Sequence, residues 1–393
     1  MSLRDGECYV CKEAIYRHHW FYQGLCADCG SYNYSKRNQK ADLSGYVALV
    51  TGGRVKIGYE TVLKLLRWGA TVIMTTRFPN DAALRYAREP DFAKWKDRLS
   101  LFGLDLRHAK AVETFIDTLV HDQSALDIII NNAAQTIRRP PLYYRHLLDN
   151  ELSESKAAGL RELFDGRVSD IHGVQGQLLL AGPSLLHYAN AGVGRTAAEL
   201  SQVPLIPGDD LIESECFPPN RLDKDGQQED RRDTNSWSLE LDQVNLIELY
   251  EVLAVNLVSP FLFNSRLKPL LSRRNRSTFI VNVTAMEGNF NAPDKSTRHP
   301  HTNMAKAGLN MMTRTAADYY YANAGIMMNS VDTGLITNER PYPLSVSEHD
   351  RRHVMAIDEV DGAARILDPI VTTVSGGDAA WGRLYKNYRE YPW

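Results

Sequence analysis

The sequence of 393 residues lacks the features of several special classes of protein. No stretch approaches the roughly 18 uninterrupted apolar residues of a membrane span, so we expect no membrane association. A formal net charge of only −3 argues against a protein that coats nucleic acid. The polar first residues are unlike an export signal, and we expect a cytoplasmic protein. With 44% hydrophobic and 24% charged residues, the composition is typical of a globular chain.

Cysteine is scarce after residue 30, where only Cys216 occurs. The other four cysteines form two C-x-x-C pairs fourteen residues apart, whereas a secreted disulfide scaffold would spread them along the chain. Four thiolates from two tight turns suit zinc at tetrahedral angles, and they leave no ligand position open. About 40 residues are too few to fold unaided, so a metal would stabilise them. We predict a structural Zn²⁺ site in a module at residues 1–40, with the ligands Cys8, Cys11, Cys26 and Cys29.

The predicted zinc module is rich in aromatic residues and ends on Lys36 and Arg37. Aromatic and basic side chains together can stack on nucleic acid, but they can also form a small core that docks on the next domain. The acidic residues of the module dilute its positive charge, which favours docking and argues against a nucleic-acid partner: Asp5, Glu7, Glu13 and Asp28.

A glycine-rich turn follows the module. The apolar run at residues 46–50 leads into Thr51-Gly-Gly-Arg-Val-Lys-Ile-Gly58, a helical pattern at residues 61–68 and a second apolar run at residues 71–75. Strand, glycine turn, helix and strand together form the dinucleotide-binding unit. The glycines let the backbone approach a pyrophosphate, and the helix N-terminus favours its charge.

These residues resemble the glycine motif TGxxxGxG of the short-chain dehydrogenase/reductase family. Thr51, Gly52 and Gly58 match it, while Lys56 occupies the place of the middle glycine. Further landmarks of the family follow in order over residues 44–140 and 240–393: Asp105 and Leu106 after a third strand, Asn131 to Ala134 for the NNAG motif, Asn256 for the helix asparagine, and Gly334 after the sixth strand.

The resemblance implies a doubly wound parallel α/β sheet of the Rossmann type over residues 41–393. It also implies the residues that hold a dinucleotide cofactor: Thr51, Gly52, Gly53, Arg54, Ile57, Gly58, Arg77, Asp105, Leu106, Asn131, Ala133, Lys306 and Gly334.

The residues after the second predicted strand favour NADP(H) over NAD(H). An acidic residue there would accept a hydrogen bond from the adenosine ribose 2′-hydroxyl. This chain has Thr76 and Arg77 instead, and Arg77 is placed like the arginine that pairs with a 2′-phosphate. Arg54 and Lys56 add positive charge nearby.

The catalytic positions depart from the family's pattern. The family uses a tyrosine four residues before a lysine, a serine after the fifth strand and a helix asparagine. Lys306 and Asn256 are present, but Thr302 replaces the tyrosine and Ala285 the serine. A threonine hydroxyl is far too weak an acid for the tyrosine's role.

Another group must therefore donate the proton if this chain is an enzyme. His301 should face away from Lys306 unless the helix begins after it, because residues five apart on a helix point in different directions. Glu287, His299 and the inserted segment described below are further candidates. We expect an atypical NADP(H)-dependent oxidoreductase. A non-catalytic NADP(H)-binding sensor or interaction protein is the main alternative, and lyase or epimerase chemistry remains open.

Asn131 and Asn256 are 125 positions apart, far more than the resemblance implies, which indicates an insertion at about residues 138–240. Helical patterns occur near residues 147–164 and 184–200, and residues 223–233 are so polar that we expect a mobile loop. Because it follows a parallel strand, the insertion can form a lid or a partner surface at the cleft, or else a peripheral decoration. Its residues nearest the chemistry in sequence are Arg138, Arg139, Tyr143, Tyr144 and His146.

The last part of the chain corresponds to the family's substrate-covering loop, at residues 335–355, followed by a helix near 358–367 and a strand and tail at 381–393. The charged residues of the loop indicate a small, polar or anionic substrate: Glu339, Arg340, His349, Arg351, Arg352 and His353. We expect a homodimer or homotetramer formed through the helices that carry Asn256 and Lys306. The aromatic tail and the Tyr319–Tyr321 run fit a contact with a neighbour.

Overall fold

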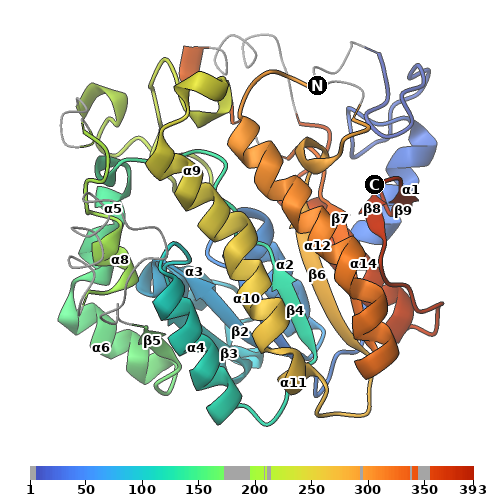
Figure 1. The fold of residues 1–393 in the computed structure, drawn as a ribbon, viewed down its shortest axis with the longest axis horizontal. Coiled ribbons are helices and arrows are strands. Elements are labelled where there is room, and N and C mark those ends of the chain that lie inside the picture. The colour runs from blue at the N-terminus through green and yellow to red at the C-terminus, as the bar shows by residue number, and fades with distance from the viewer. Residues whose placement is uncertain are drawn as a thin grey trace.

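The strands in the described part of the chain form one nine-stranded sheet, in the order β5-β3-β2-β1-β4-β6-β7-β8-β9 (Figure 1). The structure is a computed structural model that describes residues 6–171, 195–207, 209, 214–292, 295–336, 339–343 and 355–393. Neighbouring strands pair in parallel except β8 with β9. The strands are β1 (Val47–Thr51), β2 (Thr71–Thr76), β3 (Leu99–Gly103), β4 (Ile128–Asn131), β5 (Val168–Asp170), β6 (Thr278–Thr284), β7 (Ile326–Asp332), β8 (Leu384–Lys386) and β9 (Arg389–Tyr391).

Helices cover both faces of this sheet, as buried parallel strands require. The core of one face joins Leu66 with Ile366, and the core of the other joins Phe115 with Phe263. The predicted doubly wound Rossmann-type sheet is therefore confirmed. The helices are α1 (Ala27–Arg37), α2 (Lys56–Arg67), α3 (Pro79–Ala87), α4 (Ala109–Asp122), α5 (Pro141–Glu151), α6 (Glu154–Leu163), α8 (Ala197–Leu200), α9 (Leu246–Leu253), α10 (Ser259–Arg266), α11 (Lys268–Leu271), α12 (Pro300–Ala324) and α14 (Glu359–Val374).

The two additions to the sheet lie at its opposite ends (Figure 1). The insertion supplies β5, which pairs with β3 at one edge, together with α5, α6 and α8. The N-terminal module packs α1 against α14 near the other edge, where Tyr32 meets Tyr388 between β8 and β9. The insertion therefore extends the sheet as well as bordering the cleft.

The polar segment at residues 223–233 is packed, which corrects the expectation of a mobile loop. Lys224 Nζ lies 2.7 Å from Glu359 at the start of α14, and Arg54 donates to Gln227 at 2.6 Å. Asp230 pairs with Arg139 and Arg232. Composition alone gave the wrong expectation because Glu359, Arg54 and Arg139, which bind this segment, lie elsewhere in the chain.

Three other expectations from the sequence, on the helices of the insertion, the charged loop and the aromatic tail, are changed by the structure or fall outside the described residues. The helical pattern at residues 147–164 is two helices, α5 and α6, and the pattern at 184–200 falls mostly outside the described residues, which hold only α8. His349, Arg351, Arg352 and His353 also lie outside the described residues. The aromatic tail packs on its own chain, since Asn289 Nδ2 donates to Pro392 O at 2.6 Å and Tyr388 contacts the N-terminal module.

One continuous helical stretch, Leu246–Arg266, is long and apolar enough to cross a membrane by length and composition, in the part of the chain that the structure describes. Only 39% of its most apolar window is buried. It joins α9 to α10 through a π-helical turn at residues 254–258. Pro260 follows this turn and has no N–H to close a regular helical hydrogen bond. Such turns recur at functional sites, and Asn256 lies in this one.

Candidate functional site: a dinucleotide cleft

The glycine turn after β1 brings three backbone segments into close approach. Gly52 has φ +72°, and a Cβ there would lie 3.0 Å from Ala133 Cα. A Cβ on Gly58 would lie 2.1 Å from Gly52 O, so no other residue fits. Lys56, at the position of the family's middle glycine, has φ +56°, the left-handed conformation that glycine prefers. The backbone thus keeps the shape of the motif despite the lysine.

A cavity of about 390 Å³ lies beside this turn, between the carboxyl ends of β1, β2 and β4 and the insertion. Eight of the predicted cofactor residues line it: Gly52, Arg54, Ile57, Gly58, Arg77, Asp105, Leu106 and Ala133. The insertion closes part of it with Arg139, Tyr143, Tyr144 and Gln227. The position of the cavity fits the adenosine and pyrophosphate of a dinucleotide.

Cations outnumber acids around the cavity, and most of them are paired. Arg54 Nη1 donates to Asp81 at 2.8 Å, and Lys56 Nζ lies 3.6 Å from Glu339. Arg107 and Arg139 pair with Asp105 and Asp230 respectively.

Arg77 differs from these cations. Its guanidinium stacks on the Tyr144 ring at 4.4 Å and donates to the Tyr144 hydroxyl at 2.8 Å, and no described carboxylate forms an ion pair with it. Tyr144 belongs to α5 of the insertion.

Asp105 lies on the cavity wall, two residues beyond the end of β3. Burial by itself would raise the pKa of Asp105, but the Arg107 guanidinium, 2.6 Å from its carboxylate, lowers that pKa to about 2. Asp105 is therefore an anion at neutral pH, held by Arg107.

The remaining predicted cofactor residues lie behind the cavity or away from it. Thr51 Oγ1 accepts from the N–H groups of Asn132 and Ala133, at 3.1 and 3.0 Å, and so fixes the end of β4. The Asn131 side chain donates to Asn264 and Asn282 inside the core.

Two glycines among these residues also have partners outside the cavity. Gly53 O accepts from the Tyr86 hydroxyl at 2.5 Å. Gly334 packs against the N-terminal module.

Asn256 binds backbone: its Oδ1 accepts from the N–H of Gln135 at 2.7 Å, and its Nδ2 donates to the carbonyl of Gln135 at 3.0 Å. Gln135 follows the NNAG-like segment, so Asn256 fixes the loop that lines the cavity. Glu251, one helical turn earlier, accepts from the Gln135 side chain at 2.9 Å.

Lys306 and Thr302 lie on α12, and neither is among the described residues that line the cavity. Lys306 Nζ donates to Val283 O at 2.8 Å. Burial lowers the pKa of Lys306 to about 8, against the attraction of Glu287 and Asp332. The Thr302 hydroxyl is buried and has no hydrogen-bond partner among the described residues.

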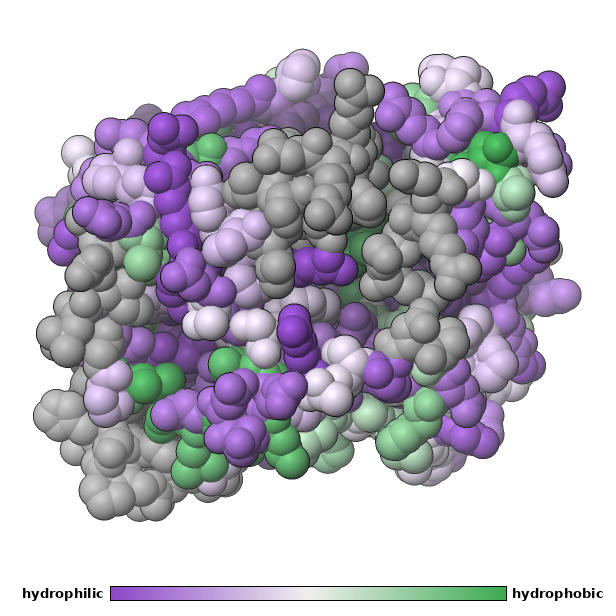
Figure 2. Space-filling model, turned by 90° about the horizontal axis from the view of Figure 1, so that it is seen from above, coloured by the Kyte–Doolittle hydropathy of each residue, from purple (hydrophilic) through white to green (hydrophobic). Residues whose placement is uncertain are grey.

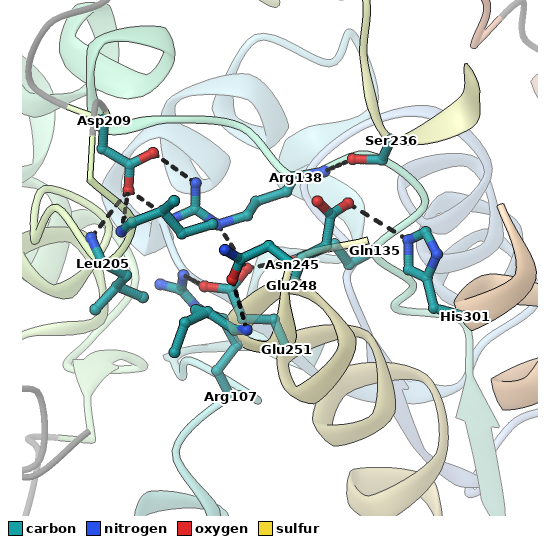
Figure 3. Close-up of polar contacts among 12 residues, drawn as sticks. Arg107, Gln135, Arg138, Leu205, Asp209, Ser236, Asn245, Glu248, Glu251 and His301 are labelled. Atoms are coloured by element: carbon teal, nitrogen blue, oxygen red, sulfur yellow. Dashed lines mark hydrogen bonds and ion pairs between the residues drawn. The ribbon is translucent and has the colours of Figure 1, made fainter. Parts of the chain in front are cut away.

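The candidate proton donors do not reach the described cavity either. His299 stacks on Trp237 with ring centroids 3.9 Å apart, and burial lowers the pKa of His299 to about 4. His301 points toward α9, where its Nε2 lies 3.4 Å from Glu248 Oε1 (Figure 3). This orientation agrees with the expectation that His301 faces away from Lys306.

Sequence reasoning missed a buried charged network that joins the insertion to the sheet (Figure 3). Arg138 forms two hydrogen bonds with Asp209, at 2.6 and 2.7 Å. Its Nε lies 3.3 Å from Glu251, which also accepts from Arg107 at 2.9 Å. The available signal was the pair of glutamates in the otherwise apolar helix α9, since buried carboxylates need partners.

The four predicted metal ligands come together at the N-terminus. Their sulfur atoms all lie within 4.8 Å of one another, and Cys11 Sγ is 3.9 Å from Cys26 Sγ. A tetrahedral Zn²⁺ site with Zn–S bonds of about 2.3 Å requires sulfur atoms about 3.8 Å apart. The cluster therefore fits one zinc ion.

Comparisons with known proteins agree with this geometry. A family model described as short chain dehydrogenase matches residues 46–148, and one described as enoyl-(acyl carrier protein) reductase matches residues 238–356. An uncharacterized protein of Acanthamoeba polyphaga mimivirus is 30% identical over 378 residues, which cover 92% of this chain and 71% of the viral protein. The chain belongs to the short-chain dehydrogenase/reductase superfamily.

Other relatives match only part of the chain. The 3β-hydroxysteroid dehydrogenase 2 of Eggerthella lenta is 33% identical over 91 residues, 23% of this chain and 34% of that enzyme. A short chain dehydrogenase of Burkholderia cenocepacia, solved in complex with NADP, shares the fold with a TM-score of 0.51 and 17% identity, over 87% of this chain and 96% of that one. The stretch between the two family-model matches falls within the predicted insertion.

Proposed function

We propose that this protein is an atypical NADP(H)-dependent oxidoreductase that acts on a small polar molecule. The observation that carries the cofactor choice is Arg77, the guanidinium on the cavity wall that forms no ion pair with a described carboxylate. A 2′-phosphate would supply an anionic partner. The NADP bound to the Burkholderia relative supports the same choice.

The chain's own residues would hold the cofactor in a simple division of labour. The backbone at Gly52 and Gly58 would receive the pyrophosphate at the N-terminus of α2. Arg77, steadied by Tyr144, would bind the 2′-phosphate. Lys306 gives one N–H to Val283 O, which leaves donors on its ammonium group for the nicotinamide ribose. Asn256 would hold the neighbouring loop.

The cofactor, when bound, supplies or accepts a hydride, and the chain must provide the accompanying proton. Thr302 cannot, because a threonine hydroxyl is too weak an acid. None of Glu287, His299 and His301 lines the described cavity. These three residues and the insertion therefore remain the candidates for the proton donor.

The position of Arg77 on the cavity wall also supports the second candidate, a non-catalytic NADP(H)-binding protein. Thr302 and Ala285 remove two groups of the family's chemistry, whereas the glycine turn and Arg77 keep the features of binding. In that case the insertion and the N-terminal module are surfaces for a partner.

Calorimetric titration with NADPH and NADH tests the shared part of both candidates. We expect tighter binding of NADPH, and equal affinities would contradict the cofactor assignment. Oxidation of NADPH in the presence of small polar aldehydes and ketones then separates the two candidates. Turnover supports the enzyme, and tight binding without turnover on any of them supports the sensor.

A further inference from the structure

The turn after β7 is enclosed by the N-terminal module and α14. This turn, residues 333–335, contains Gly334, which we expect to contact the cofactor. Gly334 has φ +84°, and a Cβ there would lie 2.3 Å from Arg365 Nη1 and 2.7 Å from Tyr9 Oη. The turn is thus held from two sides.

One of these contacts comes directly from a metal-binding turn. The backbone N–H of Leu335 donates to the Tyr9 hydroxyl at 2.7 Å. Tyr9 lies between the predicted zinc ligands Cys8 and Cys11. Because the metal would fix Cys8 and Cys11 at the two ends of this four-residue turn, the position of the Tyr9 ring depends on the metal site.

The second contact runs through a chain of hydrogen bonds from another predicted ligand. Asn33 Nδ2 donates to Cys29 O at 2.8 Å, and Asn33 Oδ1 accepts from Arg365 at 3.2 Å. Arg365 in turn donates to Thr333 O at 2.7 Å. Asn33 and Arg365 are only 1% and 2% exposed, so water competes little with these bonds.

Apolar packing joins the same parts. The buried cluster around Cys8, Tyr22 and Leu25 also contains Ile336, just after the turn, and Ile357, just before α14. Ile57 of the glycine turn packs against this cluster. The N-terminal module therefore contacts both the turn after β7 and the glycine turn that we expect to bind the pyrophosphate.

Docking of the module does not by itself require the Tyr9 contact. Lys36 and Arg37 of α1 form ion pairs with Asp368 and Asp358, at 2.6 and 2.5 Å, and Tyr22 donates to Asp361 at 2.6 Å. These contacts fasten the module to α14. The Tyr9 hydroxyl instead accepts from a backbone N–H at the cleft.

We propose that Tyr9 is a positioning residue through which the four-cysteine metal site holds the turn at residues 333–335 in the shape that the cofactor needs. Loss of the metal then loosens this turn and weakens dinucleotide binding. The inference rests on the proposed function for its second half, while the link between metal site and turn stands on the contacts alone.

Amide hydrogen exchange on the full chain tests the link. The Tyr9→Phe variant keeps the ring and loses the acceptor oxygen, so it should retain zinc. Removal of one hydrogen bond shifts an equilibrium roughly three- to tenfold, and we expect exchange at Leu335 to rise by that factor. Chelation of the metal should raise it further. Tyr16→Phe is the matched control, because Tyr16 belongs to the same module and is 97% exposed.

NADPH titration of the same proteins tests the consequence. We expect Tyr9→Phe to weaken NADPH binding by roughly three- to tenfold and Tyr16→Phe to leave it unchanged. Unchanged exchange at Leu335 in both Tyr9→Phe and the chelated protein would overturn the link. Raised exchange with unchanged NADPH affinity would overturn the role in cofactor binding. If the unaltered protein binds no dinucleotide, the proposed function fails, while the exchange measurement still decides the link.

Discussion

At the scale of single residues, the cations around the cavity differ in their partners. Arg54, Lys56, Arg107 and Arg139 each form an ion pair with a carboxylate of the chain. Arg77 has an aromatic ring and a hydroxyl as its partners instead. Arg77 feels the charge of Asp105, but among the described residues no carboxylate forms an ion pair with it, so its guanidinium can still pair with an anionic ligand.

Replacement of Arg77 by alanine should remove the preference for NADPH. A hydrogen bond to a charged group contributes about 1.5–3 kcal/mol, so NADPH affinity should fall by roughly ten- to a hundredfold while NADH affinity changes little. Calorimetry with both nucleotides measures this. Arg145→Ala, an exposed arginine beside Tyr144, should change neither affinity. A preference that survives in Arg77→Ala would assign the 2′-phosphate to another residue.

Asp105 should make the stability of the fold depend on pH in the acid range. Its pKa is about 2 when folded, below its ordinary value, so its ion pair with Arg107 stabilises the fold above about pH 4. That contribution, about 2 kcal/mol, is lost as the pH falls from about 4 toward 2. Urea unfolding of the unaltered protein and of Asp105→Asn between pH 5 and 3 should show the difference between them shrinking. A difference independent of pH would contradict the assignment.

At the scale of elements, the two additions use different interactions to reach the cleft. The insertion supplies β5 to the sheet edge and fastens itself through Arg138, which binds Asp209 and approaches Glu251 of α9. Breaking such a buried pair by removing one partner typically costs several kcal/mol, so the network fixes where the insertion lies. The N-terminal module packs its own apolar residues around the cysteine cluster, together with Ile336 and Ile357 from the rest of the chain.

The metal should therefore be necessary for the fold of the N-terminal module. We expect one zinc ion per chain by elemental analysis, and its loss in Cys26→Ser, because three thiolates hold zinc less tightly than four. The variant should also lose the contacts of the module that protect it from proteolysis. Cys216→Ser is the control, since this cysteine lies far from the cluster in sequence and should keep the metal. A module that stays folded and metal-free after chelation would refute a structural role.

At the scale of the whole molecule, α12 packs beside the helical stretch Leu246–Arg266, which it contacts at α9 and at the π-helical turn (Figure 1). Both helices carry exposed apolar side chains. Phe261 is 55% exposed on α10, and Met311 is 58% exposed on α12. The face viewed in Figure 2 is different: hydrophilic residues dominate its described part, and hydrophobic ones occur in scattered groups. Exposed apolar side chains on two neighbouring helices are suited to a symmetric contact with a second copy of the chain.

We predict that the protein forms a homodimer through this surface. The double variant Phe261→Glu/Met311→Glu should shift it to monomers, because two buried carboxylates per copy have no partners at the interface. Light scattering after size-exclusion chromatography measures the mass. Leu163→Glu, which alters an apolar residue exposed on the insertion, should leave the dimer intact. A monomeric unaltered protein, or a double variant that stays dimeric, would contradict the prediction.

Much of the fold could be predicted because its signals are local. The buried strand expected at residues 46–50, the glycine turn and the helix after it are set by neighbouring residues, and each is present, although α2 begins at Lys56 and not at residue 61. The backbone is so crowded around Gly52 and Gly58 that only glycine is tolerated at these two positions. The spacing of the four cysteines likewise predicted that their side chains lie together, as they do in the structure.

What the sequence by itself determined is therefore the Rossmann-type framework, the cluster of four cysteines, and the presence of Thr302 and Ala285 where the family has tyrosine and serine. Only the tertiary structure decided that the polar segment 223–233 is packed, that Arg77 rests on Tyr144, and that Tyr9 holds the turn beside Gly334. Each of these contacts joins residues between 67 and 326 positions apart. Such pairings depend on how whole elements pack, which neither composition nor local spacing contains.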